Sequence, residues 1–457
     1  MRRILAFLLV ISMMLAFSAC QNTKPADTPD EPAEPSVPTE PVEPAQPETP
    51  DEPEQPSEPD APEAPEAPEA PEAPDIRCIP LSYQTNRYYG MFDEGMKSYV
   101  DYPRIRADGE DWPALADALE HLSAELYDDA MDLAEDLDEL PLGDTLYSGQ
   151  ITQTVSRADE NCLSLLFEEQ RSDGTDEPDW EYEAYNFDPA TGAELTLEDV
   201  FDDAGMLPDM LETRLRERYP QAKFTELWPV VSSGTVWEEQ GQTEAEPEFT
   251  WALSYEGVEF YFEPGLIADY AAGPFHVTVR YVDEPIAVAA KFQRVPQTYA
   301  ELLEHPAERI LDLDGDGQLD TLLTEAPAEF GENGWAVPAL KIRINGEASA
   351  VPCPENTIRV QLYLVRADGA PLLYAVCGLA DGSDALMIVT LDAESAQLAA
   401  TLEHTGLAVQ AQDGANWIEL LTDPTAFTLQ TRDGTGAEYA PQPHHIGEDG
   451  LPVPDAN

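Results

Sequence analysis

The sequence predicts an α+β domain, with an antiparallel sheet and two helices, followed by a small all-β domain, after a disordered linker rich in proline and glutamate. Three observations carry this prediction. Apolar and polar residues alternate with a period of two in several stretches between residues 145 and 282, which indicates half-buried strands. Leucines recur at spacings of three and four between residues 115 and 137, which indicates an amphipathic helix. After residue 340, Asn-Gly and Asp-Gly dipeptides separate short apolar stretches, as in β-hairpins.

The chain has 457 residues, which is too long for one ordinary core, so two domains with non-globular segments are expected. Changes in composition divide it into five segments. These are a signal peptide at residues 1–20, a spacer at 21–76, the α+β domain at 77–296, the β-rich domain with a metal loop at 297–440, and a disordered tail at 441–457.

The first twenty residues have the pattern of a bacterial lipoprotein signal. Arg2 and Arg3 form a charged start, residues 4–17 are apolar, and Ser18 and Ala19 precede Cys20. The pattern predicts cleavage before Cys20 and lipidation of its thiol; an ordinary secretory signal with an incidental cysteine is the alternative. The apolar run is too short for a membrane-spanning helix. We therefore expect a lipid anchor in the cell membrane, with the protein facing outward.

The spacer is a proline repeat. Proline occupies every third position from Pro29 to Pro74, with acidic residues and alanine between. Polyproline II has three residues per turn, and at its rise per residue this stretch spans at most roughly 140 Å. A segment so poor in large apolar residues cannot bury a core. We expect it to hold the folded part away from the membrane; a ligand for a proline-recognition domain is the alternative.

The charge of the chain limits its partners. It has 91 Asp and Glu against 23 Lys and Arg, so its formal net charge is −68. Such a surface repels nucleic acid and anionic lipid headgroups, which excludes a DNA or RNA partner. It favours cationic proteins and divalent metal ions. The alternative is that acidity only keeps an exported protein soluble.

Two helices are predicted in the α+β domain. In the first, Asp111 is placed to cap, Pro113 stands in the first turn, and the leucines from Leu115 to Leu137 form one face opposite Asp and Glu. The second helix is predicted at residues 208–219. A capping signal at Thr196 and Asp199 precedes it.

Strands fill the rest of this domain. The clearest are residues 258–262 and 275–282, whose apolar positions are expected to face the core. The opposite side of both strands is expected to face solvent, where charge serves only solvation. That side carries Glu259, Glu263, His276, Thr278 and Arg280.

Three sequence blocks resemble a known family. They are Tyr102-Pro103 before the long acidic helix, FDPATGAELTLEDVF at residues 187–201, and FYFEPGLIADYAAGPFHVTV at residues 260–279. Together they resemble the extracellular domain family of the anti-sigma factor RsiV, which also occurs as an uncharacterised region in the cell-wall deacetylase PdaC. The resemblance covers about residues 77–296 and implies an α+β fold.

In RsiV this domain binds host lysozyme as a signal for proteolysis, so the resemblance implies lysozyme, or another cationic protein, as a possible partner. The match has a departure, because Gly265 follows Pro264 where the family usually has tyrosine. RsiV also has a cytoplasmic segment and a membrane helix where this chain has a lipid anchor and a rod. The resemblance therefore does not imply signalling to a sigma factor.

The sharpest chemical motif is an acidic loop in the β-rich domain. Oxygen ligands at alternate positions, with glycines between, are what a hard cation such as calcium requires. The closing glutamate of an EF-hand is absent, because Leu323 occupies its place, and the flanking residues indicate strands. The loop resembles those of FG-GAP or VCBS-type β repeats; an acidic turn without a metal is the alternative. The predicted ligands are Asp312, Asp314, Asp316, Asp320 and the backbone carbonyl of Gln318.

The remaining β-rich segment predicts a small sandwich or part of a propeller, from its regularly spaced turns. Four cysteines follow the signal, and disulfides within domains or free buried thiols are both open. The intradomain pairs would be Cys78 with Cys162 and Cys353 with Cys377.

The sequence has no Gly-x-Ser-x-Gly, no His-Glu-x-x-His, no phosphate loop and no dinucleotide fingerprint. We expect a non-enzymatic cell-surface lipoprotein that acts as a binding or sensing module of the envelope, for lysozyme or for wall components. One alternative is a calcium-dependent adhesive or structural envelope protein. Another is a wall-modifying enzyme with an unrecognised site.

Overall fold

The computed structural model describes residues 76–92, 95–140, 147–172, 179–233, 249–303, 307–316, 318–331, 334–367, 370–406, 417–431, 440–447 and 451–455. From Pro74 onward the chain forms one compact unit. The predicted signal peptide, Cys20 and nearly all of the predicted spacer lie outside the described residues. Within them, no helix is long and apolar enough to cross a bilayer. The described part is mostly sheet, with a few helices.

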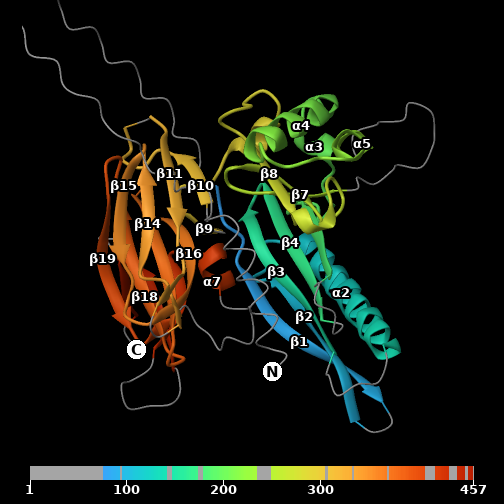
Figure 1. The fold of residues 1–457 in the computed structure, drawn as a ribbon, viewed down its shortest axis with the longest axis horizontal. Helices are drawn as coiled ribbons and strands as arrows, with labels where there is room; N and C mark the ends of the chain where they lie inside the picture. Colours follow the sequence, from blue (N-terminus) through green and yellow to red (C-terminus); the bar gives the residue numbers. More distant parts are fainter. Residues whose placement is uncertain are drawn as a thin grey trace, which may run out of the picture. The chain divides into compact units, whose positions relative to one another are not determined.

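The first sheet has five strands in the order β1-β2-β3-β4-β5, and all neighbours are antiparallel except β2 and β3. The exception follows from the connection, since α2 (Pro113–Glu139) carries the chain from β2 to β3, and parallel neighbours need such a crossover. Helix α2 lies along one side of this sheet (Figure 1). The strands are β1 (Leu81–Phe92), β2 (Gly95–Ala107), β3 (Tyr147–Asp159), β4 (Cys162–Ser172) and β5 (Asp179–Phe187).

Helix α2 confirms the helix predicted from the leucine spacing. Its leucines from Leu115 to Leu137 are buried against the sheet, and Pro113 is its first residue. The predicted cap was wrong: Trp112 holds the N-cap position without a side-chain hydrogen bond. Asp111 lies one residue too early to cap and instead forms an exposed ion pair with Arg77, at 3.6 Å.

The second sheet has three antiparallel strands, β6 (Thr250–Leu253), β7 (Gly257–Phe262) and β8 (Phe275–Arg280). One face of this sheet and the neighbouring helices share an apolar core. Helices α3, α4 and α5 lie beside β7 and β8 (Figure 1). The predicted capping box is present before α3, where Asp199 Oδ2 accepts from Thr196 N at 2.9 Å. The helical segments are α3 (Leu197–Val200), η1 (Ala204–Met206), α4 (Leu207–Arg218), α5 (Leu227–Ser233), η2 (Tyr270–Ala272) and α6 (Ala290–Gln293).

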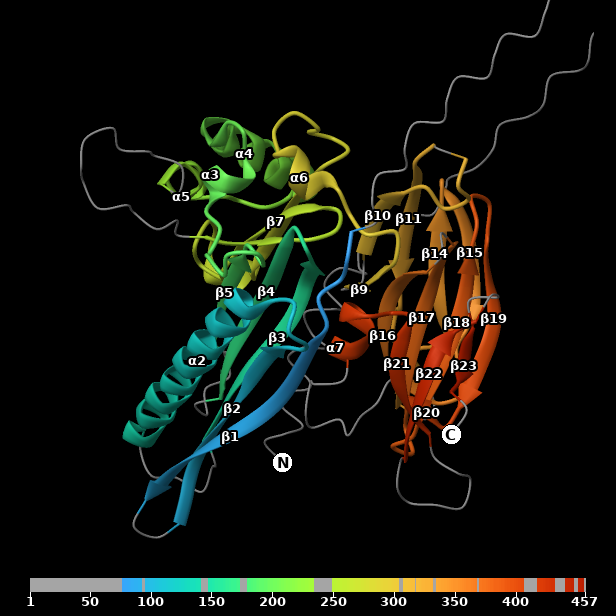
Figure 2. The same cartoon turned by 180° about the vertical axis from the view of Figure 1, so that it is seen from behind.

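The β-rich segment contains two sheets that enclose one apolar core, which is a sandwich (Figure 2). The first sheet has the order β10-β11-β14-β15 and the second β19-β18-β17-β16-β9. Their strands are β9 (Tyr299–Leu303), β10 (Ala307–Leu311), β11 (Asp320–Glu325), β14 (Ala339–Ile344), β15 (Glu347–Pro352), β16 (Thr357–Ala367), β17 (Ala370–Leu379), β18 (Asp384–Leu391) and β19 (Ala396–Glu403). A small hairpin, β12 (Glu329–Gly331) and β13 (Gly334–Ala336), branches from it.

The expectation of a disordered tail was wrong for part of residues 441–457. Strand β22 (Ala440–Ile446) pairs with β21 (Ala426–Thr431), and β23 (Pro452–Pro454) pairs with β22. With β20 (Thr405–Gly406) they form a four-stranded sheet, and α7 (Trp417–Thr422) precedes it. His444 is buried in this sheet, because alternate side chains of a strand point to the same face and His444 points to the covered one.

Contacts cross the predicted domain boundary near residue 296. One buried cluster includes Leu119 of α2 and Val155 of β3 together with Tyr363, Tyr374 and Phe427 of the β-rich segment. Ion pairs also cross this boundary, since Arg280 pairs with Glu308 at 3.1 Å and Arg309 pairs with Glu256 at 3.3 Å. The predicted boundary therefore lies inside a packed region.

Candidate functional site

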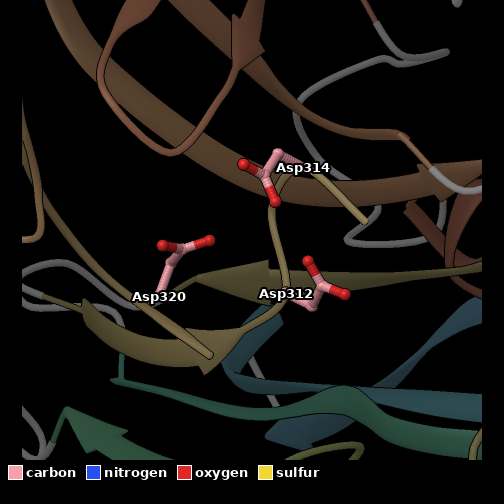
Figure 3. A group of neighbouring side chains, drawn as sticks. All are labelled: Asp312, Asp314 and Asp320. Carbon is pink, nitrogen blue, oxygen red and sulfur yellow. The ribbon is translucent and has the colours of Figure 1, made fainter. Parts of the chain in front are cut away.

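Three of the five predicted metal ligands come together in the loop between β10 and β11. One carboxylate oxygen from each of Asp312, Asp314 and Asp320 lies within 4.8 Å of the other two (Figure 3). Gly315 within the loop has a φ of 79°, a left-handed conformation that glycine adopts without strain. The tight turn therefore brings together carboxylates that stand at alternate positions in the sequence.

Both carboxylate oxygens of Asp320 accept hydrogen bonds, which fix the orientation of the side chain. Its Oδ2 accepts from the backbone N–H of Leu313 at 3.0 Å, and its Oδ1 accepts from Asn345 Nδ2 at 2.6 Å. Asn345 also accepts from the backbone N–H of Thr321 at 3.0 Å through its Oδ1. Such outer contacts orient a carboxylate toward a metal.

The other two predicted ligands are turned toward each other. Asp316 Oδ1 accepts from Gln318 N and Asp316 Oδ2 from Gln318 Nε2, both at 2.7 Å. Calcium takes six to eight oxygens from carboxylates, carbonyls and water. The three clustered carboxylates fit the core of such a donor set, and calcium binding in this loop stays a prediction.

A cavity of about 450 Å³, here called the acidic cavity, lies between α2 and strands β3, β4 and β5. Apolar residues such as Leu133 and Phe167 line its inner part, and Arg171 is the one basic residue on its wall. Its other charged residues are seven acids: Asp129, Asp132, Asp136, Glu169, Glu181, Glu183 and Glu263.

Acids outnumber bases on the wall of the acidic cavity by seven to one. Its arginine, Arg171, pairs with Asp136 at 2.9 Å. The pKa of Asp129 is raised, first by partial burial and then by the neighbouring acids Glu125 and Asp132. Partial burial also raises the pKa of Glu183. Both side chains remain open to water, which solvates and screens their charge.

A second cavity, here called the polar cavity, has a volume of about 490 Å³. Residues of β3 and β4 line one side of it, including Thr154 and Leu166, and residues of β7 and β8 line another. The expectation that this side faces solvent was wrong for β7, which is buried on both faces, whereas on β8 the same side is half-buried. Glu259 is only 9 % exposed, and on the same face Leu166 of β4 packs against Tyr261 and Ala252 of this sheet.

Glu259, Tyr261 and His276 form a connected group in the polar cavity. Tyr261 and His276 are cross-strand neighbours, and their rings stack with centroids 5.0 Å apart. The Tyr261 hydroxyl donates to Glu259 Oε2 at 2.6 Å. Burial lowers the pKa of His276, which favours the neutral imidazole, and its Nε2 is buried without a hydrogen-bond partner among the described residues.

Ion pairs close the other end of the polar cavity. Glu256 pairs with Arg280 at 2.8 Å and with Arg309 at 3.3 Å, while Arg309 pairs with Glu301 at 3.0 Å. Arg280 also pairs with Glu308 at 3.1 Å. Burial raises the pKa of Glu256 to about 7, although Arg309 and Arg280 act in the opposite direction. The network joins β8 to β9 and β10.

One feature of the sequence indicates that this face of β7 is covered. On the expected solvent side of β7, Glu259 is followed two positions later by Tyr261, a large and mostly apolar side chain. An aromatic residue on each side of a strand is typical of a strand covered on both faces.

The cysteines form no disulfide in the structure, so the option of free thiols holds for all four. Cys78 Sγ donates to the backbone oxygen of Thr298 at 3.3 Å, and Cys162 is buried. Cys353 is half-buried and Cys377 is buried, where its Sγ lies 3.5 Å from Met387 Sδ, so the second proposed pair is not bonded.

No family model matches the chain, and no curated protein matches it either. Among solved structures, similar chains are members of the DUF3298 family, a domain family of unknown function. One, from Bacteroides fragilis NCTC 9343, is 17 % identical with a TM-score of 0.32, and covers 47 % of this chain and 96 % of its own. Another, from Pseudomonas aeruginosa PAO1, is 15 % identical with a TM-score of 0.34, over 47 % of this chain and 96 % of its own. At these values the similarity says nothing about ligands, and the likeness to the RsiV domain family stays a prediction.

Proposed function

We propose that this chain is a non-enzymatic, lipid-anchored binding module of the cell surface, and that it captures a cationic protein in its acidic cavity. Lysozyme is the first candidate, because the sequence blocks that resemble the RsiV domain imply it. The lipoprotein signal and the proline-rich spacer support an outward-facing position at the membrane.

The observation that carries the proposal is the lining of the acidic cavity, with seven acids and one arginine. Like charges gathered on one wall repel one another, and a lysine or arginine from a partner relieves this repulsion. The volume of about 450 Å³ lies in the range of ligand pockets, and the apolar inner wall suits the methylene stem of such a side chain.

The overall charge supports the same partner class. A net charge of −68 attracts cationic proteins over long range and raises their association rate. Long-range attraction alone is unspecific, whereas a cavity with fixed acids also selects the geometry of the docked group. The two contributions differ in their dependence on salt, which allows them to be separated.

The test is a calorimetric titration of the chain from residue 21 onward, without lipid, with lysozyme at physiological salt. Cytochrome c serves as a cationic control of different shape. We expect saturable one-to-one binding of lysozyme. The triple variant Asp129→Asn, Asp132→Asn, Glu181→Gln should weaken it by about 100-fold, which corresponds to roughly 1 kcal/mol for each removed charge.

The matched control removes the same three charges from exposed sites outside the cavity, as Asp202→Asn, Asp269→Asn, Glu217→Gln. This control should change the affinity by less than about threefold. Equal weakening by both triple variants would mean that only net charge matters. Absence of binding to both cationic proteins would remove the proposal altogether.

A second proposal concerns the carboxylate loop, because three of its acids already lie within 4.8 Å. We propose that Asp312, Asp314 and Asp320 bind calcium and stabilise the β-rich segment. Millimolar calcium should then raise the thermal midpoint of the wild type and leave that of Asp314→Asn unchanged, since binding to the native state stabilises it. An equal rise in both proteins, or with magnesium and calcium alike, would argue against a specific site.

A further inference from the structure

The polar cavity contains a buried hydrogen-bonding group that the described part of the protein does not satisfy. His276 Nε2 is buried and has no partner among the described residues. Glu259 is 9 % exposed, and its Oε2 accepts from the Tyr261 hydroxyl at 2.6 Å. A buried polar group without a partner is costly, and such groups in a cavity mark places where a ligand or water bonds.

The cavity continues beyond this pair. A smaller cavity of about 190 Å³ shares Thr154, Leu166, Tyr219, Tyr261 and His276 with it. His276 and Tyr261 therefore lie where the two volumes meet. The combined space has the size of a small-molecule site, and hydroxyl-bearing, aromatic and charged side chains line most of it.

The charged residues that line the polar cavity do not favour an ionic ligand. The chain has only 23 basic residues, and three arginines line this cavity, but Arg280 and Arg309 are paired with Glu256, Glu301 and Glu308. Arg218 is exposed at the rim. An anion entering the cavity beside His276 would meet the Glu259 carboxylate, which opposes it.

The groups that remain favour hydroxyl-bearing ligands. A carboxylate oxygen accepts from an O–H group, and a neutral imidazole either accepts from or donates to one, depending on its tautomer. Thr154 and Thr278 add hydroxyls that do both, and Tyr219 adds an aromatic ring that can pack on C–H groups. Amphipathic rings with hydroxyls around their edge combine these properties.

We propose that the polar cavity is a binding site for a small uncharged saccharide, with Glu259 and His276 bonding to its hydroxyls and Tyr261 positioning Glu259. This proposal does not depend on the acidic cavity or on a protein partner. The two sites are lined by different charged residues.

The experiment titrates the chain from residue 21 onward with glucose, N-acetylglucosamine, maltose and cellobiose, up to tens of millimolar. Putrescine and citrate are the cationic and anionic controls. Binding is followed by calorimetry and by the NMR signals of the histidine rings, of which the chain has six. We expect saturable binding of at least one saccharide, with a shift of the His276 signals, and no binding of the two ions.

The variants Glu259→Gln and His276→Gln should each weaken that binding at least tenfold. Matched controls at exposed positions, Glu217→Gln and His121→Gln, should leave it unchanged. If a cavity variant fails to fold, the shift of the His276 signals in the wild type still decides the matter. The triple variant of the acidic cavity should bind saccharide normally, so the two proposals fail independently.

Three outcomes would overturn the proposal. One is no saturable binding of any of the four saccharides. Another is saccharide binding that leaves the His276 signals unmoved and is unaffected by both cavity variants. The last is binding of putrescine or citrate in the cavity in place of the saccharides, which would assign the site to an ionic ligand.

Discussion

The acidic cavity and the polar cavity are similar in volume but differ in the balance of acidic and basic residues on their walls. The first, of about 450 Å³, has seven acids and one arginine on its wall, and most of these acids remain open to water. The second, of about 490 Å³, has three glutamates and three arginines, and Glu259 and Glu301 are buried. The difference in water access explains the difference in pairing.

Water solvates an exposed carboxylate, so the fold has no need to supply a cation for it, and the charge stays available to a partner. A buried carboxylate loses that solvation and requires an ion pair or hydrogen bonds from the protein itself. The comparison teaches that, in a chain this acidic, the scarce arginines are placed where burial demands them. Three predictions test this contrast.

The largest effect is expected from Arg309→Met. The substitution leaves Glu256 and Glu301 buried without their shared guanidinium, and breaking such a pair costs roughly 3–5 kcal/mol of the free energy of unfolding. Arg171→Met in the acidic cavity removes an exposed pair with Asp136 and should cost less than about 1 kcal/mol. Urea denaturation of both variants at pH 7 measures the two values. Similar losses of unfolding free energy in the two variants would contradict the difference between buried and exposed ion pairs.

An intermediate effect concerns pH and Glu256. Its pKa is about 7 in the folded protein, against 4.5 for an unperturbed glutamate. Because the folded-state pKa is the higher one, the folded state binds more protons, so the stabilisation is full below pH 4.5 and is lost as the pH rises through about 7. The free energy of unfolding should therefore fall by about 2 kcal/mol between pH 5 and pH 8.

Glu256→Gln should remove most of this pH dependence. Burial also raises the pKa of Glu301, Asp129 and Glu183, which gives their contributions the same sign. Glu183 is exposed, however, so Glu183→Gln should flatten the profile much less. Chemical denaturation at several pH values makes the comparison, and equal flattening by both variants would contradict it.

The smallest effect is expected from Asp129→Asn in the acidic cavity, and it has the opposite sign. On α2, Asp129 has like charges at Glu125 and Asp132, four residues before it and three after it. Removing it should raise the free energy of unfolding by about 0.5 kcal/mol. The gain should vanish near 1 M salt, because salt screens exposed charges. A loss of stability at low salt would show that Asp129 has an internal partner.

Local patterns in the sequence were enough for several elements. The leucines of α2 and the capping box at Thr196 and Asp199 were predicted because helices are read from spacings of three and four. The cluster of Asp312, Asp314 and Asp320 was also visible, since its members come from one tight loop. Asp316 was also predicted as a ligand but lies outside this cluster, and its carboxylate accepts from the backbone N–H and the side-chain amide of Gln318.

The two cavities were outside the reach of such patterns. The acids of the acidic cavity come from α2, β4, β5 and the residue after β7, and its wall exists only once α2 packs along the sheet. In the same way, alternation correctly placed Val258, Phe260 and Val277 in the core but wrongly gave Glu259 and His276 to solvent.

By itself, the sequence determined where helices and strands form, which of their faces is apolar, and how acidic the surface is, because these follow from neighbours a few residues apart. Only the tertiary structure decided which polar faces become covered. A period of two identifies the two faces of a strand, but what packs on the second face depends on segments about a hundred residues away. Burial, and with it the pairing of charge, was therefore decided by packing.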